Sequence, residues 1–113
     1  MNTPPDECLI VMVTAGSAEE ADRIAAALVD ERLAACVNVL GPARSVYRWQ
    51  GEIERAEEWL LIIKTTGPVF PTLEARVKAL HSYEMPEVIT LPVVAGSDAY
   101  LAWVRANATA PSR

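Results

Sequence analysis

Apolar residues follow two different periods along the chain, and the change between them predicts a protein of mixed helices and strands. The continuous apolar run at 9–14 is rich in β-branched residues, which favours a buried central strand. Ser17, with Glu20 three residues later, forms a capping box. Apolar residues at helical spacing follow it, so we expect a first helix over 18–32.

Strand chemistry then continues over most of the segment 33–66, interrupted at Gly41 and Pro42 and turning at 50–52. The pattern predicts a hairpin with strands of about 16 residues, or about 50 Å at roughly 3.3 Å per residue. A compact chain of this length is only about 35 Å across, so the hairpin tip should protrude. The exposed edges of such a ribbon are usually covered by another chain, which predicts an oligomer.

The remaining pattern completes the predicted fold. Apolar residues at every third or fourth position predict a second helix over 69–81, and "EVITLPVV" at 87–94 predicts a fourth strand. Ser97 or Asp98 can cap a last helix. The order is β-α-β-β-α-β followed by a C-terminal helix. We therefore expect an α+β fold, a ferredoxin-like βαββαβ sandwich with a long central hairpin.

One domain over 1–113 is expected, with flexible tails at 1–7 and 107–113. Two helices would cover one face of the sheet and leave apolar residues bare on the other face. The mean hydropathy of +0.15 is high for a small soluble chain. Both features predict that apolar surface is buried between subunits.

Composition argues against several classes of function. A net charge of −5, without a cluster of Lys and Arg, argues against nucleic-acid binding. The longest apolar runs, at 8–13 and 59–63, are far shorter than the roughly 20 residues that span a bilayer, so no membrane association is expected. Nothing resembles a signal peptide, and the two cysteines lack metal-site spacing, which predicts free thiols and a cytoplasmic location. No nucleotide-binding or hydrolase motif occurs, and no enzyme activity is expected.

The stretch "LHSYEMPE" at 80–87 holds the only histidine of the chain among other metal-ligand side chains. Imidazole and carboxylate oxygen suit Cu(II) or Zn(II), and Met85 suits Cu(I). His81, Glu84 and Glu87 are therefore candidate ligands of a divalent metal that is not tightly bound. A tight site needs three or four protein ligands, so others would have to come from a distant segment or another subunit. The alternative is that His81 only ends a helix, where the helix dipole favours its charge.

Further side chains leave alternatives open. Cys36 is either a small buried hydrophobic residue or a nucleophile paired with the lone histidine. Lys64 interrupts an apolar strand face and either reaches the rim or faces a cleft that binds an anion. Tyr47 and Trp49 share one face near the hairpin tip, where they anchor a subunit interface or stabilise the ribbon itself. The acidic run at 51–58 is expected to be a solvated hairpin tip.

Four segments together resemble the CutA divalent-cation tolerance family across nearly the whole chain. They are "ERLAACVNV" at 31–39, "SVYRWQGEI" at 45–53, "LLIIKTT" at 60–66 and "LHSYEMPEVITLPV" at 80–93. The resemblance implies a ferredoxin-like subunit, a tight homotrimer built through the long hairpins, and a role in tolerance of copper and other divalent cations.

The resemblance also bears on the metal site. In copper-binding relatives the proposed ligands are a His-His pair before Pro-Tyr and a cysteine near the end of the first strand. Only the second histidine is matched here, by His81. Leu80 stands at the first histidine, Ser82 at the proline, and Val13 or a neighbour near the cysteine position. The resemblance thus implies weak metal binding at or near His81, with ligands that differ from those of the relatives.

Such trimers also look like the PII signalling proteins, which bind small effectors in clefts between subunits. The alternative function is therefore a sensor or scaffold for which metal is incidental. Its intersubunit cleft would sense a small anion or metabolite and would be lined by Cys36, Tyr47, Trp49, Lys64, His81, Tyr83 and Glu87.

Overall fold

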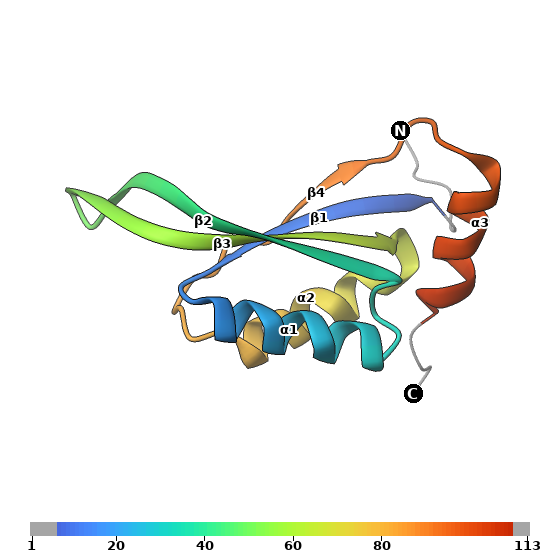
Figure 1. The fold of residues 1–113 in the computed structure, drawn as a ribbon, viewed down its shortest axis with the longest axis horizontal. Helices are drawn as coiled ribbons and strands as arrows, with labels where there is room; N and C mark the ends of the chain where they lie inside the picture. Colours follow the sequence, from blue (N-terminus) through green and yellow to red (C-terminus); the bar gives the residue numbers. More distant parts are fainter. Residues whose placement is uncertain (1–6, 110–113) are drawn as a thin grey trace.

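The computed structural model describes residues 7–109. Its elements run in the order β1 (Cys8–Ala15), α1 (Ala18–Asp30), β2 (Cys36–Trp49), β3 (Glu52–Thr66), a short 3₁₀ helix η1 (Gly67–Val69), α2 (Phe70–Leu80), β4 (Ile89–Pro92) and α3 (Asp98–Asn107). The strands form one antiparallel sheet in the order β2-β3-β1-β4 (Figure 1). The predicted α+β fold is confirmed, with a four-stranded sheet and three α-helices.

The capping box predicted at the start of α1 is present. Ser17 has an extended backbone, and its Oγ accepts a hydrogen bond from the backbone N–H of Glu20 at 3.1 Å. The helix ends at Asp30, two residues before the predicted end, because Arg32 takes a left-handed φ of 62°. Its buried face consists of Glu20, Ala21, Ile24 and Leu28.

β2 and β3 form the predicted long hairpin, and its tip extends beyond the helices (Figure 1). The turn residues Gln50 and Gly51 have φ values of 52° and 85°. Positive φ at both central residues is what a two-residue turn needs to match the twist of its strands. The predicted protruding tip is therefore present in the structure.

The predicted break in the first hairpin strand is a bulge within one continuous strand. The register of β2 on β3 shifts between Leu40 and Ala43. A Cβ atom at Gly41 would lie 2.6 Å from Cγ of Trp59, so glycine is required where β2 passes this ring. Beyond the bulge Ala43 pairs with Glu58, which places Glu58 at the base of the tip.

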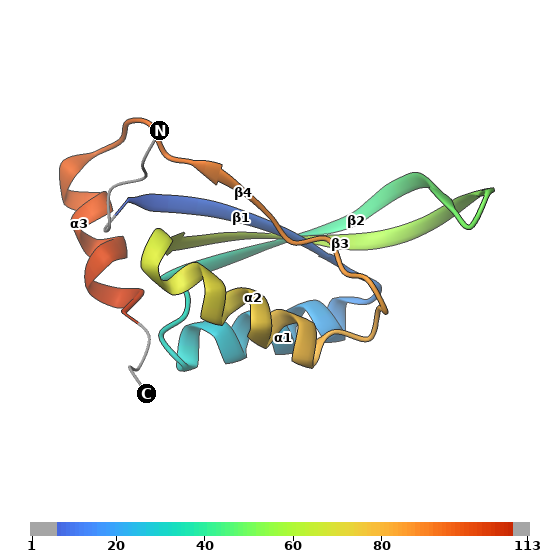
Figure 2. The same ribbon diagram turned by 180° about the vertical axis from the view of Figure 1, so that it is seen from behind.

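α1 and α2 cover one face of the sheet, and α3 lies at the end opposite the hairpin tip (Figures 1 and 2). The core lies between the sheet and these two helices and includes Val11, Val13, Ile24, Leu28, Leu61, Ile63, Leu73 and Val77.

The other face of the sheet keeps apolar side chains that no helix covers. Leu40 pairs with Leu60, which alternates with the buried Leu61 and so faces away from the core. Leu40 is 50% exposed, and Leu91 on β4 is also 50% exposed. The second face, predicted to be bare, is bare in the single chain.

β4 is shorter than the predicted strand at 87–94, since it pairs with β1 only over Leu9–Met12. It forms one edge of the sheet, as the presence of Pro92 in the strand indicates. α2 begins at Phe70 because the chain first forms the 3₁₀ turn η1, and its C-cap residue is His81.

The C-terminal end of the described chain is packed. Asn107 ends α3 and Ala108 is buried, although the sequence analysis placed both in a flexible tail. The predicted tail residues 1–6 and 110–113 lie outside the described residues. In the part of the chain that the structure describes, no helix is both long enough and apolar enough to cross a membrane.

Candidate functional site

His81 is buried at the end of α2, with a side-chain exposure of 0%. Its Nε2 lies 2.7 Å from the carbonyl oxygen of Thr14, and its Nδ1 accepts a hydrogen bond from the backbone N–H of Tyr83 at 3.0 Å. Because that N–H can only donate, Nδ1 carries no proton, and the proton of the neutral ring sits on Nε2. Both ring nitrogens are therefore already bonded within the chain.

Glu20 on α1 is the third partner of this cluster. Its carboxylate accepts hydrogen bonds from the backbone N–H of Ser82 at 2.7 Å and from its Oγ at 3.1 Å, and Oε2 lies 3.6 Å from Nδ1 of His81. Burial acts to raise the pKa of Glu20, but the two bonds from Ser82 and the nearby His81 hold this pKa below its ordinary value. The carboxylate thus ties α1 to the loop that follows α2.

The lowered pKa of Glu20 predicts a loss of stability in acid. Because the pKa of Glu20 is lower in the folded state than in the unfolded state, its charged carboxylate stabilises the fold fully at pH values above 4.5. This contribution is lost as the pH falls from 4.5 through the lower pKa of the folded state. Urea unfolding of the wild type and of Glu20→Gln should therefore differ most near neutral pH and converge in acid. A difference that stays constant from about pH 7 down to about pH 3 would contradict this assignment.

Tyr83 links the same loop to the hairpin. Its hydroxyl donates to Oε2 of Glu58 at 2.8 Å. Burial, the hydrogen bond to Glu58 and the charge of Glu58 raise the pKa of Tyr83 well above its ordinary value, so the hydroxyl remains a donor. Glu58 is only 8% exposed, which corrects the prediction of a solvated tip for this end of the acidic run. The reason is the bulge, which pairs Glu58 with Ala43 at the base of the tip.

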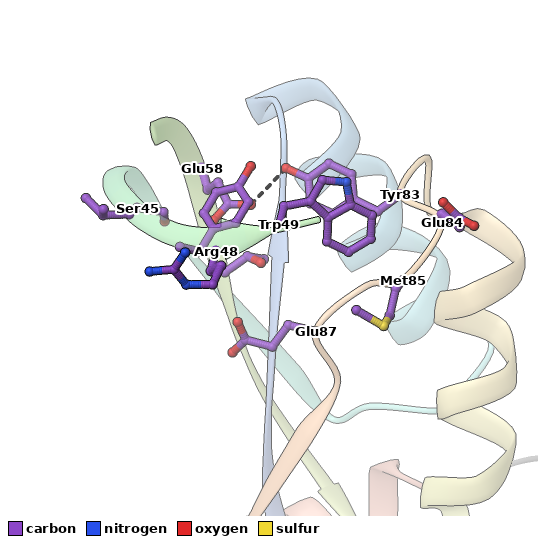
Figure 3. A pocket seen from close by; sticks show the side chains of 11 residues that line it. Ser45, Arg48, Trp49, Glu58, Tyr83, Glu84, Met85 and Glu87 are labelled. Atoms are coloured by element: carbon purple, nitrogen blue, oxygen red, sulfur yellow. Dashed lines mark hydrogen bonds between the residues drawn. The ribbon is translucent and has the colours of Figure 1, made fainter. Parts of the chain in front are cut away.

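Tyr83 and Glu58 line a cavity of about 630 Å³ between the hairpin and the loop after α2 (Figure 3). Its volume lies within the range of small-molecule sites. Burial and the charge of Glu58 on β3 raise the pKa of Glu87, which lies in the loop after α2. β2 contributes Tyr47, Arg48 and Trp49, β3 contributes Glu58, and the loop contributes Tyr83, Glu84, Met85 and Glu87. We call this cavity the hairpin pocket.

The three predicted metal ligands take different positions. Glu84 and Glu87 line the hairpin pocket, whereas His81 is buried with both nitrogens bonded. Among residues 7–109, no group of three or more His, Cys, Asp or Glu side chains lies close enough to hold a metal ion. His81 lies at the end of a helix, as the alternative interpretation had it, and its Nδ1 there accepts a hydrogen bond from the backbone of the following loop.

The predicted cleft residues form two groups within one chain. Tyr47, Trp49 and Tyr83 line the hairpin pocket. Cys36 is half-buried and pairs with Lys64 at the other end of the 14-residue strand β2, where Nζ of Lys64 donates to the side chain of a neighbouring asparagine. Strand length separates the two groups, because the stretch of β2 from Cys36 to Tyr47 extends over about 35 Å.

Sequence reasoning missed Glu58 and Arg48 as pocket residues. Glu58 could be found only from the register beyond the bulge, which pairs it with Ala43. Arg48 alternates with Tyr47 and Trp49 along β2 and so belongs to the other strand face. It reaches the rim because the ribbon ends there in a tight turn, where its Nη1 donates to the carbonyl oxygen of Gly51 at 3.3 Å.

Comparisons with known proteins agree with this fold. The chain is 52% identical over 98 residues to the divalent-cation tolerance protein CutA of Thermus thermophilus, covering 87% of this chain and 95% of that protein. The human protein CutA is 44% identical over 101 residues, covering 89% of this chain and 56% of that longer protein.

Solved structures show the same arrangement of elements. The structure of the T. thermophilus divalent cation tolerance protein superposes with a TM-score of 0.87 at 51% identity, covering 88% of this chain and 97% of that chain. CutA1 from Oryza sativa superposes with a TM-score of 0.87 at 39% identity, covering 92% and 96% of the two chains. A family model described as CutA1 divalent ion tolerance protein matches residues 9–107. The chain belongs to the CutA1 divalent ion tolerance family.

Proposed function

We propose that this chain acts in divalent-cation tolerance as a non-catalytic, cytoplasmic homotrimer that binds divalent metal weakly in the hairpin pocket, beside His81. The observation that carries the metal proposal is the pair Glu58 and Glu87, which line one pocket from two separate elements. They interact closely enough for the charge of Glu58 to raise the pKa of Glu87. A divalent cation between them would replace this repulsion with attraction.

Weak binding follows from the ligands that the pocket offers. Carboxylate oxygens bind divalent cations, but two of them leave most of the coordination sphere to water or to another subunit. Glu84 and Met85 line the same pocket and can add an oxygen or a thioether contact for Zn(II) or copper. His81 contributes indirectly, because its bond to the backbone of Tyr83 holds the loop that carries these residues.

Two further features support the assembly and the location. The uncovered sheet face and the unpaired outer edges of β2 and β4 are surfaces that a ferredoxin-like subunit would bury against other copies of itself. Cys8 and Cys36 are free thiols, as expected in a reducing compartment.

Glu87→Gln is expected to weaken the binding of Zn(II) and Cu(II) about tenfold, since it removes one of the carboxylate charges that line the pocket without changing side-chain size. Calorimetric titration of the metal-free protein measures this directly. The matched control is Glu19→Gln, which removes an exposed carboxylate from the first turn of α1. Equal effects of the two substitutions would show that metal binds only through the overall negative charge, and would reject the pocket as the metal site.

A further inference from the structure

One wall of the hairpin pocket is aromatic. Tyr47 and Trp49 come from the same face of β2, and Tyr83 comes from the loop after α2. Tyr47 and Tyr83 line this cavity from two separate elements. Met85, which is 69% exposed, lines the same pocket from the loop (Figure 3). Three aromatic side chains and a thioether thus give the pocket a polarizable surface.

The rest of the pocket is mainly acidic. Carboxylates of Glu58, Glu84 and Glu87 line it, and Arg48 is the one basic side chain among the lining residues. The guanidinium of Arg48 donates to the carbonyl oxygen of Gly51, so part of it is occupied at the hairpin turn. Three carboxylates therefore line the pocket against a single guanidinium.

This combination also suits an organic cation that is larger than a bare metal ion. Within the described residues the acidic side chains do not form a three-ligand metal group. Aromatic rings do not coordinate Zn(II) or Cu(II), but their faces attract ammonium groups, and carboxylates placed around such rings add Coulomb attraction. The cavity of about 630 Å³ has room for a small organic molecule.

We propose that the hairpin pocket binds an organic ammonium ion, with the cationic group held between the Tyr47–Trp49–Tyr83 wall and the carboxylates of Glu58 and Glu87. The site uses the same carboxylates as the proposed metal site, but it also needs the aromatic wall, which metal binding does not. The two proposals can therefore fail separately.

The test is a titration of the ¹⁵N-labelled full-length protein, followed by NMR of its indole N–H signals. The chain has three tryptophans, and the signal of Trp49 is identified by its loss in Trp49→Phe. Choline and putrescine are the probes, one a quaternary and one a primary ammonium, with NaCl added to equal ionic strength as the reference. We expect the Trp49 signal to shift and saturate with at least one probe while that of the exposed Trp103 stays in place. The tighter-binding probe shows whether ring contacts or hydrogen bonds to carboxylate dominate.

Two substitutions separate this site from general cation binding. Glu87→Gln should weaken the bound probe about fivefold by removing one charge. Tyr47→Leu, followed at the Trp49 indole signal, and Trp49→Leu, followed by calorimetric titration with the same probe, should each reduce probe binding while leaving the calorimetric Zn(II) titration unchanged. No shift beyond that caused by NaCl with either probe, or equal shifts of Trp49 and Trp103, would overturn the proposal. Retention of full probe affinity in both aromatic variants would also overturn it.

Discussion

Replacing His81 with alanine is expected to lower the free energy of unfolding by about 3 kcal/mol. The ring is fully buried and joins Thr14 on β1 to the backbone of Tyr83, next to the carboxylate of Glu20. Its removal leaves a carbonyl oxygen and an N–H without partners in a site that excludes water, and it also leaves a cavity. The buried Glu20 also loses the imidazole ring whose Nδ1 lies 3.6 Å from its Oε2.

Urea unfolding, followed by circular dichroism at fixed protein concentration, measures this loss. Lys78→Ala is the control, because Lys78 makes only an exposed ion pair with Glu74 on the same helix and should change stability by less than about 1 kcal/mol. The opposite outcome is equally informative. If His81→Ala unfolded at the wild-type urea concentration but lost Zn(II) binding, the imidazole would be a metal ligand and the hydrogen-bonded arrangement would be wrong.

Much of the fold could be predicted because its signals are local. The capping box at Ser17 needs only a hydroxyl and a residue three positions later, and it forms as expected. Gln50-Gly51 can take the two positive φ values that a tight hairpin turn needs, and the turn falls there. The alternation of residues along β3 places Leu61 and Ile63 on one face, and the structure shows that this face is the buried one.

The candidate site was harder to predict because it depends on contacts between distant segments. His81 looked like a metal ligand, and only the positions of Thr14 and Tyr83 show that both of its nitrogens are bonded. Glu58 read as one of several solvated carboxylates until the bulge fixed its register. Lys64 and the tip aromatics were predicted to line one cleft between subunits, and within one chain they lie at opposite ends of the hairpin, because alternation shows which face a residue occupies but not its distance along a strand.

Leu40→Asp is expected to convert the proposed trimer into monomers. Leu40 is 50% exposed in the single chain and lies on the sheet face that no helix covers, so a carboxylate there remains hydrated in the isolated subunit. Within an interface the same carboxylate would be buried without a partner, at a cost of several kcal/mol for each copy. Because symmetry repeats the substitution in every subunit, the cost multiplies across the assembly.

Sedimentation equilibrium at micromolar concentration distinguishes the two states. Val29→Asp is the matched control, since Val29 is 44% exposed on α1 and lies outside the uncovered sheet face. We expect the wild type and Val29→Asp to sediment as trimers and Leu40→Asp as a monomer. A Leu40→Asp protein that remains trimeric would show that subunits meet through another surface. A monomeric wild type would mean that the long hairpin and the apolar sheet face are stable without a partner, and the argument for assembly would fail.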